Sequence, residues 1–375
     1  MIEKKLKIGI IGTRGVPNYH GGFEQFAEFF SVYLAQNNHD VYVYNSSSHP
    51  YQEVLFNGVN IIHCYDPEDK IGASGQFIYD LNCILDSRKR NFDVLLQLGY
   101  TSSSIWYKLL PKKAVVITNM DGLEWKRSKY SKPIQKFLKF AEKLAVNSSD
   151  YLISDSIGIQ NYIQETYHVT SEYIAYGAEM FNDPNQDFLM EYDVEAYKYN
   201  MLIARLEPEN NIETILDGVA KSHNKTVFLV VGKHDVNKFG AYLKDKFKDV
   251  NNVRFIGGVY NMEHLNNLRY YSNLYFHGHS VGGTNPSLLE AMSSKALIIA
   301  HNNQFNKSIL KDNALFFKTD LEVKHYIETI KKSNHQHKIE TCYEDIRKKY
   351  NWNGINNQYF EFLNDCNFKS KQSTS

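Results

Sequence analysis

Several features that mark whole classes of protein are scarce or missing in this sequence. Its 375 residues include only four cysteines, at positions 64, 83, 342 and 366, and none lies in a CxxC pair or a Cys/His cluster. We therefore expect neither a disulfide framework nor a zinc site, and reduced cysteines are typical of a cytoplasmic protein. Gly-x-Ser-x-Gly, Walker and HExxH patterns are also missing. No metal site and no cofactor are expected.

Long apolar runs and an excess of charge are missing as well. No run approaches the roughly 18–20 residues of a transmembrane helix. The N-terminal MIEKKLKIGIIG leads directly into a strand, so we expect no signal peptide. Lysine and arginine total 42, as do aspartate and glutamate, so no global charge favours nucleic acid, and none is expected as a partner. The chain is predicted to be soluble or peripheral to a membrane.

What the sequence does contain is short apolar runs that alternate with helical patterns, in two series. LKIGIIG (6–12) and DVYVYN (40–45) are typical of buried parallel strands, and FEQFAEFFSVYLAQNN (23–38) has helical spacing. The second series starts near residue 199. The predicted fold is α/β with two doubly wound, Rossmann-like domains. The predicted domains are residues 1–180, a linker at 181–198, residues 199–350, a helix at 351–367 and a disordered tail at 368–375.

The segment HSVGGTNPSLLE (279–290) has the composition of a helix start that faces an anion. Gly282 and Gly283 let backbone N–H groups approach a ligand, Asn285 can cap a helix, and Pro286 fits its first turn. Free N–H groups at a helix N-terminus attract phosphate. A strand-to-helix turn without a ligand has the same composition, so the segment alone leaves both interpretations open.

The loop GTRGVPNYHGGFEQF (12–26) joins the first strand to the first helix. Its Gly12-x-x-Gly15 spacing is not that of a dinucleotide fingerprint, and the second strand ends in Asn45-Ser46-Ser47 without an acidic residue for a ribose. NAD binding is therefore not expected. The length of the loop and its Arg14 and His20 favour a functional role over a purely structural turn.

Two charged residues follow predicted strands, where ligands bind in open parallel sheets. Asp121 follows the apolar run AVVIT, although an Asp-Gly pair is also an ordinary turn. Arg205 follows YNMLIA, and an arginine there can hold a diphosphate bidentately. A surface arginine in a loop is the alternative.

Residues 126–143 form a local basic stretch with the pattern of an amphipathic helix. The lysines on one face, at i, i+4, i+7 and i+11, are Lys132, Lys136, Lys139 and Lys143. The neighbouring apolar stripe is Phe137, Phe140, Ala141 and Leu144. This pattern fits either a solvated face over a buried stripe or a helix against an anionic membrane surface.

Together these segments resemble a known family. IGIIGTRGVPNYHGGFEQFAE, NMDGLEWKRSKY, LIARLEPENNIETI and HGHSVGGTNPSLLEAM are similar, in order, to motifs of the bacterial family-4 retaining glycosyltransferases, and more narrowly of their rhamnosyltransferase branch. The similarity spans residues 6–320. It implies the GT-B fold, with two Rossmann-like domains facing a central cleft and a last helix that crosses back to the first domain.

The resemblance also implies an activity. A sugar, L-rhamnose from dTDP-L-rhamnose, would pass to a saccharide acceptor, lipid-linked, in the synthesis of capsule or cell-wall polysaccharide. UDP- and GDP-sugars are the other donors considered. The protein would then work in the cytoplasm, peripheral at the inner face of the plasma membrane.

Site residues follow from the same resemblance. Arg205 matches the arginine of the donor diphosphate, Glu290 the glutamate of the nucleotide ribose, and Asp121 the place of a catalytic histidine. These three are the implied catalytic residues. The implied donor-binding residues are Gly21, Gly22, Arg205, Asn210, His279, Gly283, Thr284, Asn285 and Glu290. The implied acceptor-binding residues are Arg14, His20, Glu24, Asp121 and Glu124.

Two positions depart from the family pattern. The first glutamate of the usual pair falls at Gly282, and His279 or Asn285 can replace its contact. The lysine that usually follows the diphosphate arginine falls at Asn210. Two alternatives to a transferase stay open: a sugar-nucleotide epimerase of the same architecture, and a non-catalytic protein that binds sugar nucleotides.

Overall fold

The computed structural model describes residues 5–127 and 129–373, which divide into two compact units. The first unit comprises the chain up to Trp125, Lys132–Tyr176 and the segment from Trp352 onward. The second comprises Lys126–Ser131 and Gly177–Asn351.

The first unit is an eight-stranded sheet in the order β3-β4-β2-β1-β5-β6-β7-β8, parallel except for β3. Its strands are β1 Lys7–Ile11, β2 Asp40–Ser46, β3 Leu55–Phe56, β4 Val59–Cys64, β5 Val94–Leu98, β6 Val115–Asn119, β7 Tyr151–Ser154 and β8 Glu172–Tyr173. Its helices are α1 Gly22–Gln36, α2 Glu68–Ile71, α3 Gly75–Ser87, α4 Lys132–Ser148, α5 Ile157–Tyr167 and α13 Trp352–Ser373. Strands β5 and β6 are buried throughout because helices cover both faces of the sheet.

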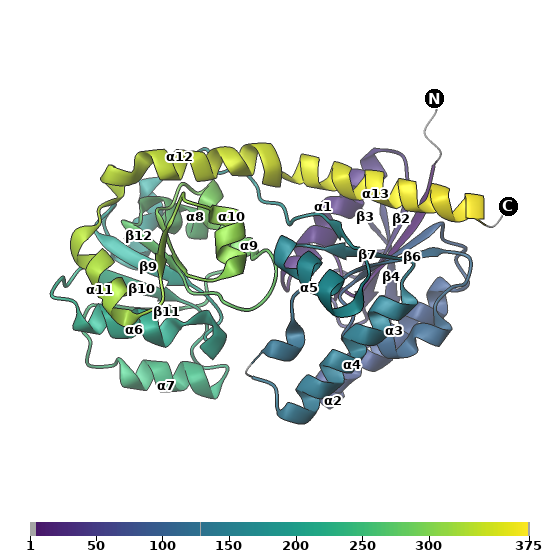
Figure 1. Ribbon diagram of the computed structural model, residues 1–375, viewed down its shortest axis with the longest axis horizontal. Coiled ribbons are helices and arrows are strands. Elements are labelled where there is room, and N and C mark those ends of the chain that lie inside the picture. The colour runs from purple at the N-terminus through teal and green to yellow at the C-terminus, as the bar shows by residue number, and fades with distance from the viewer. Residues whose placement is uncertain (1–4, 128, 374–375) are drawn as a thin grey trace. The chain divides into compact units, whose positions relative to one another are not determined.

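The second unit is a six-stranded parallel sheet in the order β11-β10-β9-β12-β13-β14. Its strands are β9 Tyr199–Ile203, β10 Val227–Val231, β11 Val253–Gly257, β12 Leu274–His277, β13 Ile298–His301 and β14 Leu315–Phe317. Its α-helices are α6 Ile212–Lys221, α7 Lys238–Lys246, α8 Met262–Tyr271, α9 Pro286–Ser293, α10 Gln304–Leu310, α11 Asp320–Thr329 and α12 Gln336–Asp345. Both sheets are doubly wound, as the alternating pattern predicts (Figure 1).

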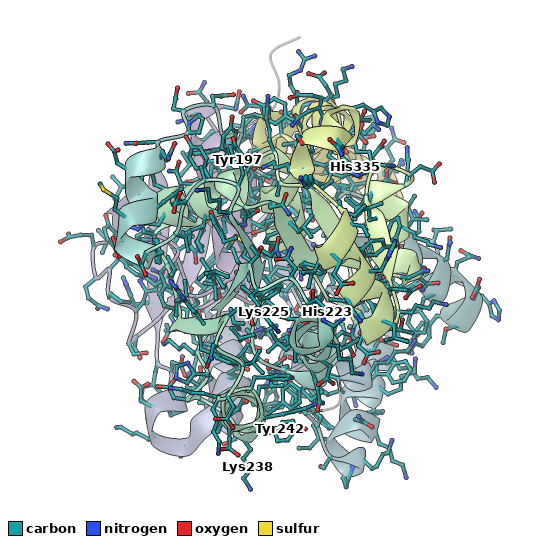
Figure 2. The ribbon with its side chains drawn as sticks, turned by 90° about the vertical axis from the view of Figure 1, so that its left-hand side faces the viewer. Tyr197, His223, Lys225, Lys238, Tyr242 and His335 are labelled. Atoms are coloured by element: carbon teal, nitrogen blue, oxygen red, sulfur yellow. The ribbon has the colours of Figure 1, made fainter. Side chains whose placement is uncertain are left out.

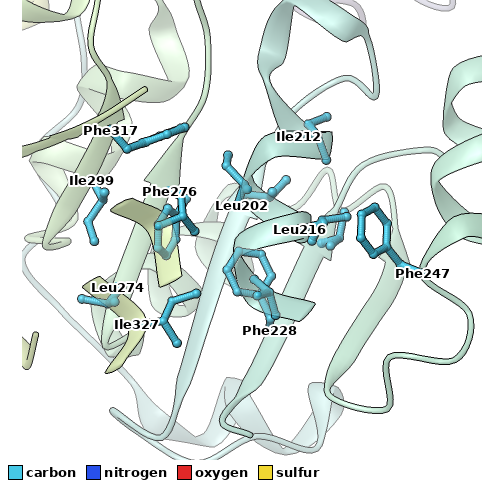
Figure 3. Close-up of a cluster of buried hydrophobic side chains, with 14 of the residues drawn as sticks. Leu202, Ile212, Leu216, Phe228, Phe247, Leu274, Phe276, Ile299, Phe317 and Ile327 are labelled. Carbon is cyan, nitrogen blue, oxygen red and sulfur yellow. The ribbon is translucent and has the colours of Figure 1, made fainter. Parts of the chain in front are cut away.

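One face of the second sheet packs on α6, α7 and α11 and forms a continuous apolar core (Figure 3). Helix α6 contributes residues at i, i+3, i+4 and i+7, which are Ile212, Ile215, Leu216 and Val219. They contact side chains of the strands, among them Leu202 and Phe228. The helical period therefore places the apolar stripe of α6 on the sheet.

The ends of the second unit differ from the expected domain boundaries. The stretch 181–198, expected to be a linker, contains a 3₁₀ segment, Gln186–Tyr192, that packs on α8. There the Tyr192 hydroxyl lies 2.9 Å from His264 Nδ1, and the Asn185 N–H donates to Asn267 Oδ1 at 2.7 Å. The acidic residues of this stretch face solvent while Leu189 is buried. The polar composition therefore gave no indication that the segment packs on α8.

The tail also differs from expectation. Helix α13 runs from Trp352 to Ser373, so residues 368–373, expected to be disordered, continue this helix, and 374–375 lie outside the described residues. Within the first unit α13 packs against α1, where Tyr359 contacts Phe26 and Phe30 with ring centroids 4.4 and 5.4 Å apart. Lys371 near its end pairs with Asp93 at 2.7 Å.

Candidate functional site

The sheet order of the second unit defines where a ligand can enter. Strand β9 lies between β10 and β12, so the chain reverses its direction of winding there. In open parallel sheets the crevice for ligands lies beyond the carboxyl ends of the strands at such a switch point. Two loops meet there: residues 204–211 after β9 and residues 278–285 after β12. They contain Arg205, Asn210 and His279, which the sequence predicted on the donor side.

The two loops are tied together by close backbone contacts. Gly278 must be glycine, because a Cβ there would lie 1.9 Å from the Asn210 carbonyl oxygen. Asn211 Nδ2 donates to the Gly278 carbonyl at 2.7 Å, and the Ser280 hydroxyl donates to the Glu209 carbonyl at 2.7 Å. The loops therefore form one preorganised surface.

Asn210 and His279, the positions associated with the departures from the family pattern, are hydrogen-bonded partners. Asn210 Nδ2 donates to the Arg205 carbonyl at 2.7 Å, which turns its Oδ1 toward His279 Nδ1 at 2.6 Å. His279 therefore carries its proton on Nδ1. Burial, followed by the nearby Arg127 and Arg205 charges, lowers the pKa of His279 to about 4, so the ring is neutral at pH 7.

Gly282, the position of a glutamate in the family pattern that the sequence resembles, lies beside His279. Its φ of +119° lies in the region that favours glycine, and a Cβ there would be 3.5 Å from His279 Nε2. A glutamate at 282 would strain this backbone. The His279 ring thus lies next to the position where that side chain would begin.

Positive charge gathers around these loops. The Arg205 side chain is exposed and has no hydrogen-bond or ion-pair partner among the described residues. Arg127, half-buried, lies 3.9 Å from Glu207, and Lys129 lies 3.4 Å from the same carboxylate. Glu207 balances Arg127 and Lys129, whereas the Arg205 guanidinium is available to an anion.

Helix α9 begins as the sequence predicts. Asn285 is its N-cap, with Oδ1 accepting from the Ser287 N–H at 2.9 Å, and Pro286 occupies the first turn. The cap uses the side-chain oxygen of Asn285. His279 and Asn285 both stay candidates for the contact of the missing glutamate. Gly283 and Thr284 precede the cap, half-buried and buried respectively.

Glu290, one turn into α9, is held by a side chain that sequence reasoning missed. Its Oε2 accepts from Arg269 Nη2 at 2.5 Å, and the Arg269 side chain is only 1% exposed. Arg269 also donates to Asn266 Oδ1 at 3.1 Å, and the Ser287 hydroxyl lies 2.9 Å from the Tyr275 hydroxyl. Arg269 fixes one oxygen of Glu290, and no described residue hydrogen-bonds the other. An arginine inside the otherwise amphipathic pattern of α8 was the available signal.

In the first unit, β1 is the strand at the switch point, between β2 and β5, and the loop after it is held by hydrogen bonds to other segments of the unit. Arg14, expected to bind acceptor, forms a two-pronged ion pair with Glu68, with N–O distances of 2.7 and 3.1 Å. The Arg14 N–H donates to Glu24 Oε1 at 2.9 Å. Arg14 and Glu24 are thus brought together, whereas His20 is exposed in the loop. Gly21 is the N-cap of α1, which Gly22 begins.

Asp121 follows β6, also at the carboxyl edge of the first sheet. Its backbone is left-handed, with φ of +50°, and its N–H donates to Asn119 Oδ1 at 3.0 Å. Asn119 is itself held by the buried Tyr359 hydroxyl at 2.8 Å. The half-buried Asp121 carboxylate has no hydrogen-bond partner among the described residues. Glu124 is half-buried three residues further on.

The four lysines predicted to lie on one face of α4 differ in their surroundings, because one of them pairs with a buried carboxylate. Lys139 pairs with Glu142 at 2.8 Å and lies over the rings of Trp125, Tyr162 and Tyr167. Glu142, only 2% exposed, also accepts from Tyr167 at 2.5 Å and from Trp125 at 3.0 Å. A buried carboxylate needs such partners, and Lys139 is one of them. Lys132, Lys136 and Lys143 are exposed.

The apolar stripe of α4 is not fully buried. Phe137 is 37% exposed and Phe140 55%, with Ile134 at 46%, while Ala141 is buried.

Among the described residues no group of three or more His, Cys, Asp and Glu side chains could hold a metal. In the same part of the chain no helix is long and apolar enough to cross a membrane.

Comparisons with known proteins agree with this architecture. Residues 5–179 match a domain of unknown function, DUF1972, and residues 194–349 match the family Glycosyl transferases group 1. No curated protein matches significantly.

Solved structures of similar fold cover nearly the whole chain. A sucrose-phosphate synthase from Thermosynechococcus elongatus has a TM-score of 0.78 at 15% identity, over 99% of this chain and 100% of that one. HepE of Anabaena, solved with UDP-glucose, has 0.75 at 14%, over 96% and 100%. The trehalose-6-phosphate synthase OtsA has 0.71 at 10%, over 95% and 98%. At such identities the likeness shows the fold, which is that of GT-B glycosyltransferases. Residues 194–349 thus match the family Glycosyl transferases group 1, in a chain whose two parallel-sheet units have the GT-B fold.

Proposed function

We propose that this protein is a retaining glycosyltransferase that transfers L-rhamnose from dTDP-L-rhamnose to a saccharide acceptor in the synthesis of a cell-surface polysaccharide. The observation that carries the proposal is the switch point of the second unit. There Arg205, whose side chain has no partner among the described residues, adjoins the Asn210–His279 pair, within the segment that matches the group 1 family. Nucleoside diphosphate sugars are the proposed class of donor because HepE, which has the same fold, was solved with UDP-glucose.

The proposed chemistry requires stabilisation of a leaving group. The acceptor hydroxyl oxygen bonds to the anomeric carbon while the bond from that carbon to the diphosphate oxygen breaks, and the electron pair leaves with the nucleoside diphosphate. The hydroxyl proton passes to a leaving phosphate oxygen. Arg205 and the N–H groups at the start of α9 would stabilise the charge that develops there. One carboxylate oxygen of Glu290 would accept from the nucleotide ribose.

The neutral His279 supports a donor sugar other than glucose. In place of a carboxylate, which only accepts hydrogen bonds, the site presents an imidazole whose Nδ1 proton is engaged by Asn210. Its Nε2 is then a single acceptor toward the sugar. A 6-deoxy sugar has one hydroxyl fewer than glucose, which suits this reduced hydrogen-bonding capacity.

Two measurements test the proposal. Thermal shifts with dTDP, UDP and GDP identify the nucleotide, because a ligand of the native state raises its stability. Incubation with dTDP-L-rhamnose, with UDP-glucose as the comparison, and with lipid-linked saccharides should then yield a rhamnosylated product by mass spectrometry. Donor turnover to a free sugar epimer would instead support an epimerase, and binding without turnover a non-catalytic protein.

The acceptor is proposed to be lipid-linked, with α4 on an anionic membrane at the inner face of the plasma membrane. Exposed Ile134, Phe137 and Phe140 lie among the exposed Lys132, Lys136 and Lys143, and this combination of apolar and basic side chains fits a lipid interface. Each lysine would contribute about 1 kcal/mol near such a surface.

Vesicle sedimentation tests this placement. Charge reversal of Lys132, Lys136 and Lys143 should abolish binding to vesicles with phosphatidylglycerol, and so should high salt. Reversal of three exposed lysines elsewhere, Lys238, Lys318 and Lys369, is the matched control and should leave binding in place. Equal behaviour of the two triple variants would show that α4 is only a solvated surface.

A further inference from the structure

A cavity of about 630 Å³ lies in the second unit, at the end of the sheet opposite to Arg205 and His279. Its lining includes Tyr197, Thr226 and Asn273. Thr226 and Asn273 directly precede β10 and β12, and Tyr197 lies two residues before β9, so all three are at the amino ends of these strands. Figure 2 shows this end of the unit, with Tyr197 and His335 above His223 and Lys225. The cavity is therefore separate from the proposed donor site.

Lys332 lines this cavity and is a buried amine, only 6% exposed. Its backbone N–H donates to Asn273 Oδ1 at 3.0 Å, and its Nζ donates to the Tyr270 carbonyl. The Nζ also lies 5.3 Å from the centroid of the Tyr270 ring and 5.5 Å from that of Tyr197. Among the described residues, one carbonyl and two aromatic faces are the polar and ring contacts of this Nζ.

No described carboxylate pairs with Lys332, although two acidic residues line the same cavity. Glu340 accepts from Lys295 at 3.2 Å, and Glu328 accepts from the His223 N–H at 2.8 Å. The remaining cation of the lining is the exposed Lys331. A buried ammonium normally has an anion or a network of acceptors beside it, because its transfer out of water is costly.

Burial has the expected effect on the amine. It lowers the pKa of Lys332 to about 7, so about half of the amines are neutral at that pH. The titratable groups that share the cavity with it are Tyr197, Tyr270, Lys295, Lys331, Glu328 and Glu340. An anion that entered the cavity would restore the charge on Lys332 and take up a proton as it bound.

We propose that this cavity binds a small molecule with a carboxylate or phosphate group attached to an apolar ring, and that Lys332 is the cation that pairs with the anionic group. The apolar part would contact the aliphatic and aromatic lining from Ile327, Ile330, Ile339 and Tyr270. The inference is independent of the proposed transfer reaction, since none of these residues lies at the carboxyl ends of the strands.

Competitive acetylation with trace acetic anhydride, followed by peptide mass spectrometry, tests the proposal in the wild-type protein. The probes are phenyl phosphate and benzoate, with phenol as the neutral comparison and the exposed Lys238 as the reference amine. Each anion that binds should raise the pKa of Lys332. A rise of one unit cuts the neutral fraction at pH 7 from about a half to about a tenth, which slows its acetylation about fivefold. The anion that slows the acetylation of Lys332 more identifies the preferred anionic group.

Variants separate the cavity from a general salt effect. Lys332→Met keeps length and suits a buried position, and it should abolish the thermal stabilisation that the better anion gives to the wild type. Lys238→Met should keep this stabilisation. The proposal is overturned if neither anion slows acetylation of Lys332 relative to Lys238, if phenol slows it equally, or if Lys332→Met keeps the stabilisation. UDP should not protect Lys332, and full protection by UDP would contradict a separate site.

Discussion

Substitution of Glu290 by glutamine separates the ion pair that this side chain forms from the binding role proposed for it. Glu290 neutralises Arg269, whose side chain is 1% exposed. Its second oxygen is the one proposed to accept from the nucleotide ribose. Loss of one partner from a buried ion pair typically destabilises by about 3–5 kcal/mol. Glutamine still accepts one hydrogen bond, so we expect the lower end, about 3 kcal/mol, for Glu290→Gln.

Hydrogen exchange is the suitable measurement for this loss. All three tryptophans, Trp106, Trp125 and Trp352, belong to the first unit, so their fluorescence does not report on α8 and α9. A loss of about 3 kcal/mol corresponds to exchange that is about 150-fold faster in peptides of these helices when exchange follows local opening. Glu263→Gln, the same change at an exposed position of α8, is the matched control and should leave exchange within about threefold.

The double variant Arg269→Met, Glu290→Gln distinguishes folding from binding. It removes both charges, and apolar replacement of a buried pair is often neutral in stability, so exchange should return to within about tenfold of the wild type. Nucleotide affinity, measured by calorimetry, should stay weaker by the ~1.5–3 kcal/mol of a hydrogen bond to a charged group. If the double variant binds nucleotide like the wild type, Glu290 acts only through folding. If Glu290→Gln changes neither exchange nor affinity, both assignments are wrong.

Three further predictions concern Arg205 of the second unit and two carboxylates of the first unit, Asp121 and the buried Asp80. Arg205→Ala should lose most sugar-transfer turnover and Arg205→Lys should recover only part, because a point charge does not reproduce a bidentate contact; wild-type turnover of the alanine variant in a steady-state assay would exclude this role. Asp121→Asn should lower kcat while nucleotide affinity stays nearly intact, and a loss of nucleotide binding by calorimetry would contradict a role in the chemical step or acceptor alignment. Burial raises the pKa of Asp80 from 3.8 to about 6, against the opposing hydrogen bond from Ser102. The folded state therefore holds the proton more tightly, and the first unit should lose up to about 3 kcal/mol of stability as the pH rises from about 4 to about 6. Asp80→Asn should flatten this dependence in tryptophan-monitored unfolding, and an unchanged slope would rule out Asp80 as its source.

The fold and the local geometry of α9 followed from short-range patterns. Buried runs such as VLLQL and VFLVV form β5 and β10, because sheets covered on both faces require continuous apolar strands. Asn285 caps α9 because its side chain reaches the N–H of Ser287, two residues on. Signals of this kind lie within a few residues of each other, so the sequence alone was sufficient for the two Rossmann-like sheets and for the helix start beside Gly283.

The partners of the site residues were decided only by tertiary structure. Asn210 meets His279, Arg14 meets Glu68 and Arg269 meets Glu290 because the fold brings together the loops and helices that carry them, and no spacing rule encodes such pairs. Lys139 shows the same limit: its helical spacing assigned it to the lysine face, whereas the buried Glu142 in the next turn holds it. A buried charge has to find a partner wherever the fold supplies one, so the sequence determined which side chains are present near the switch point, and the packing of distant segments decided which of them remain free to bind a ligand.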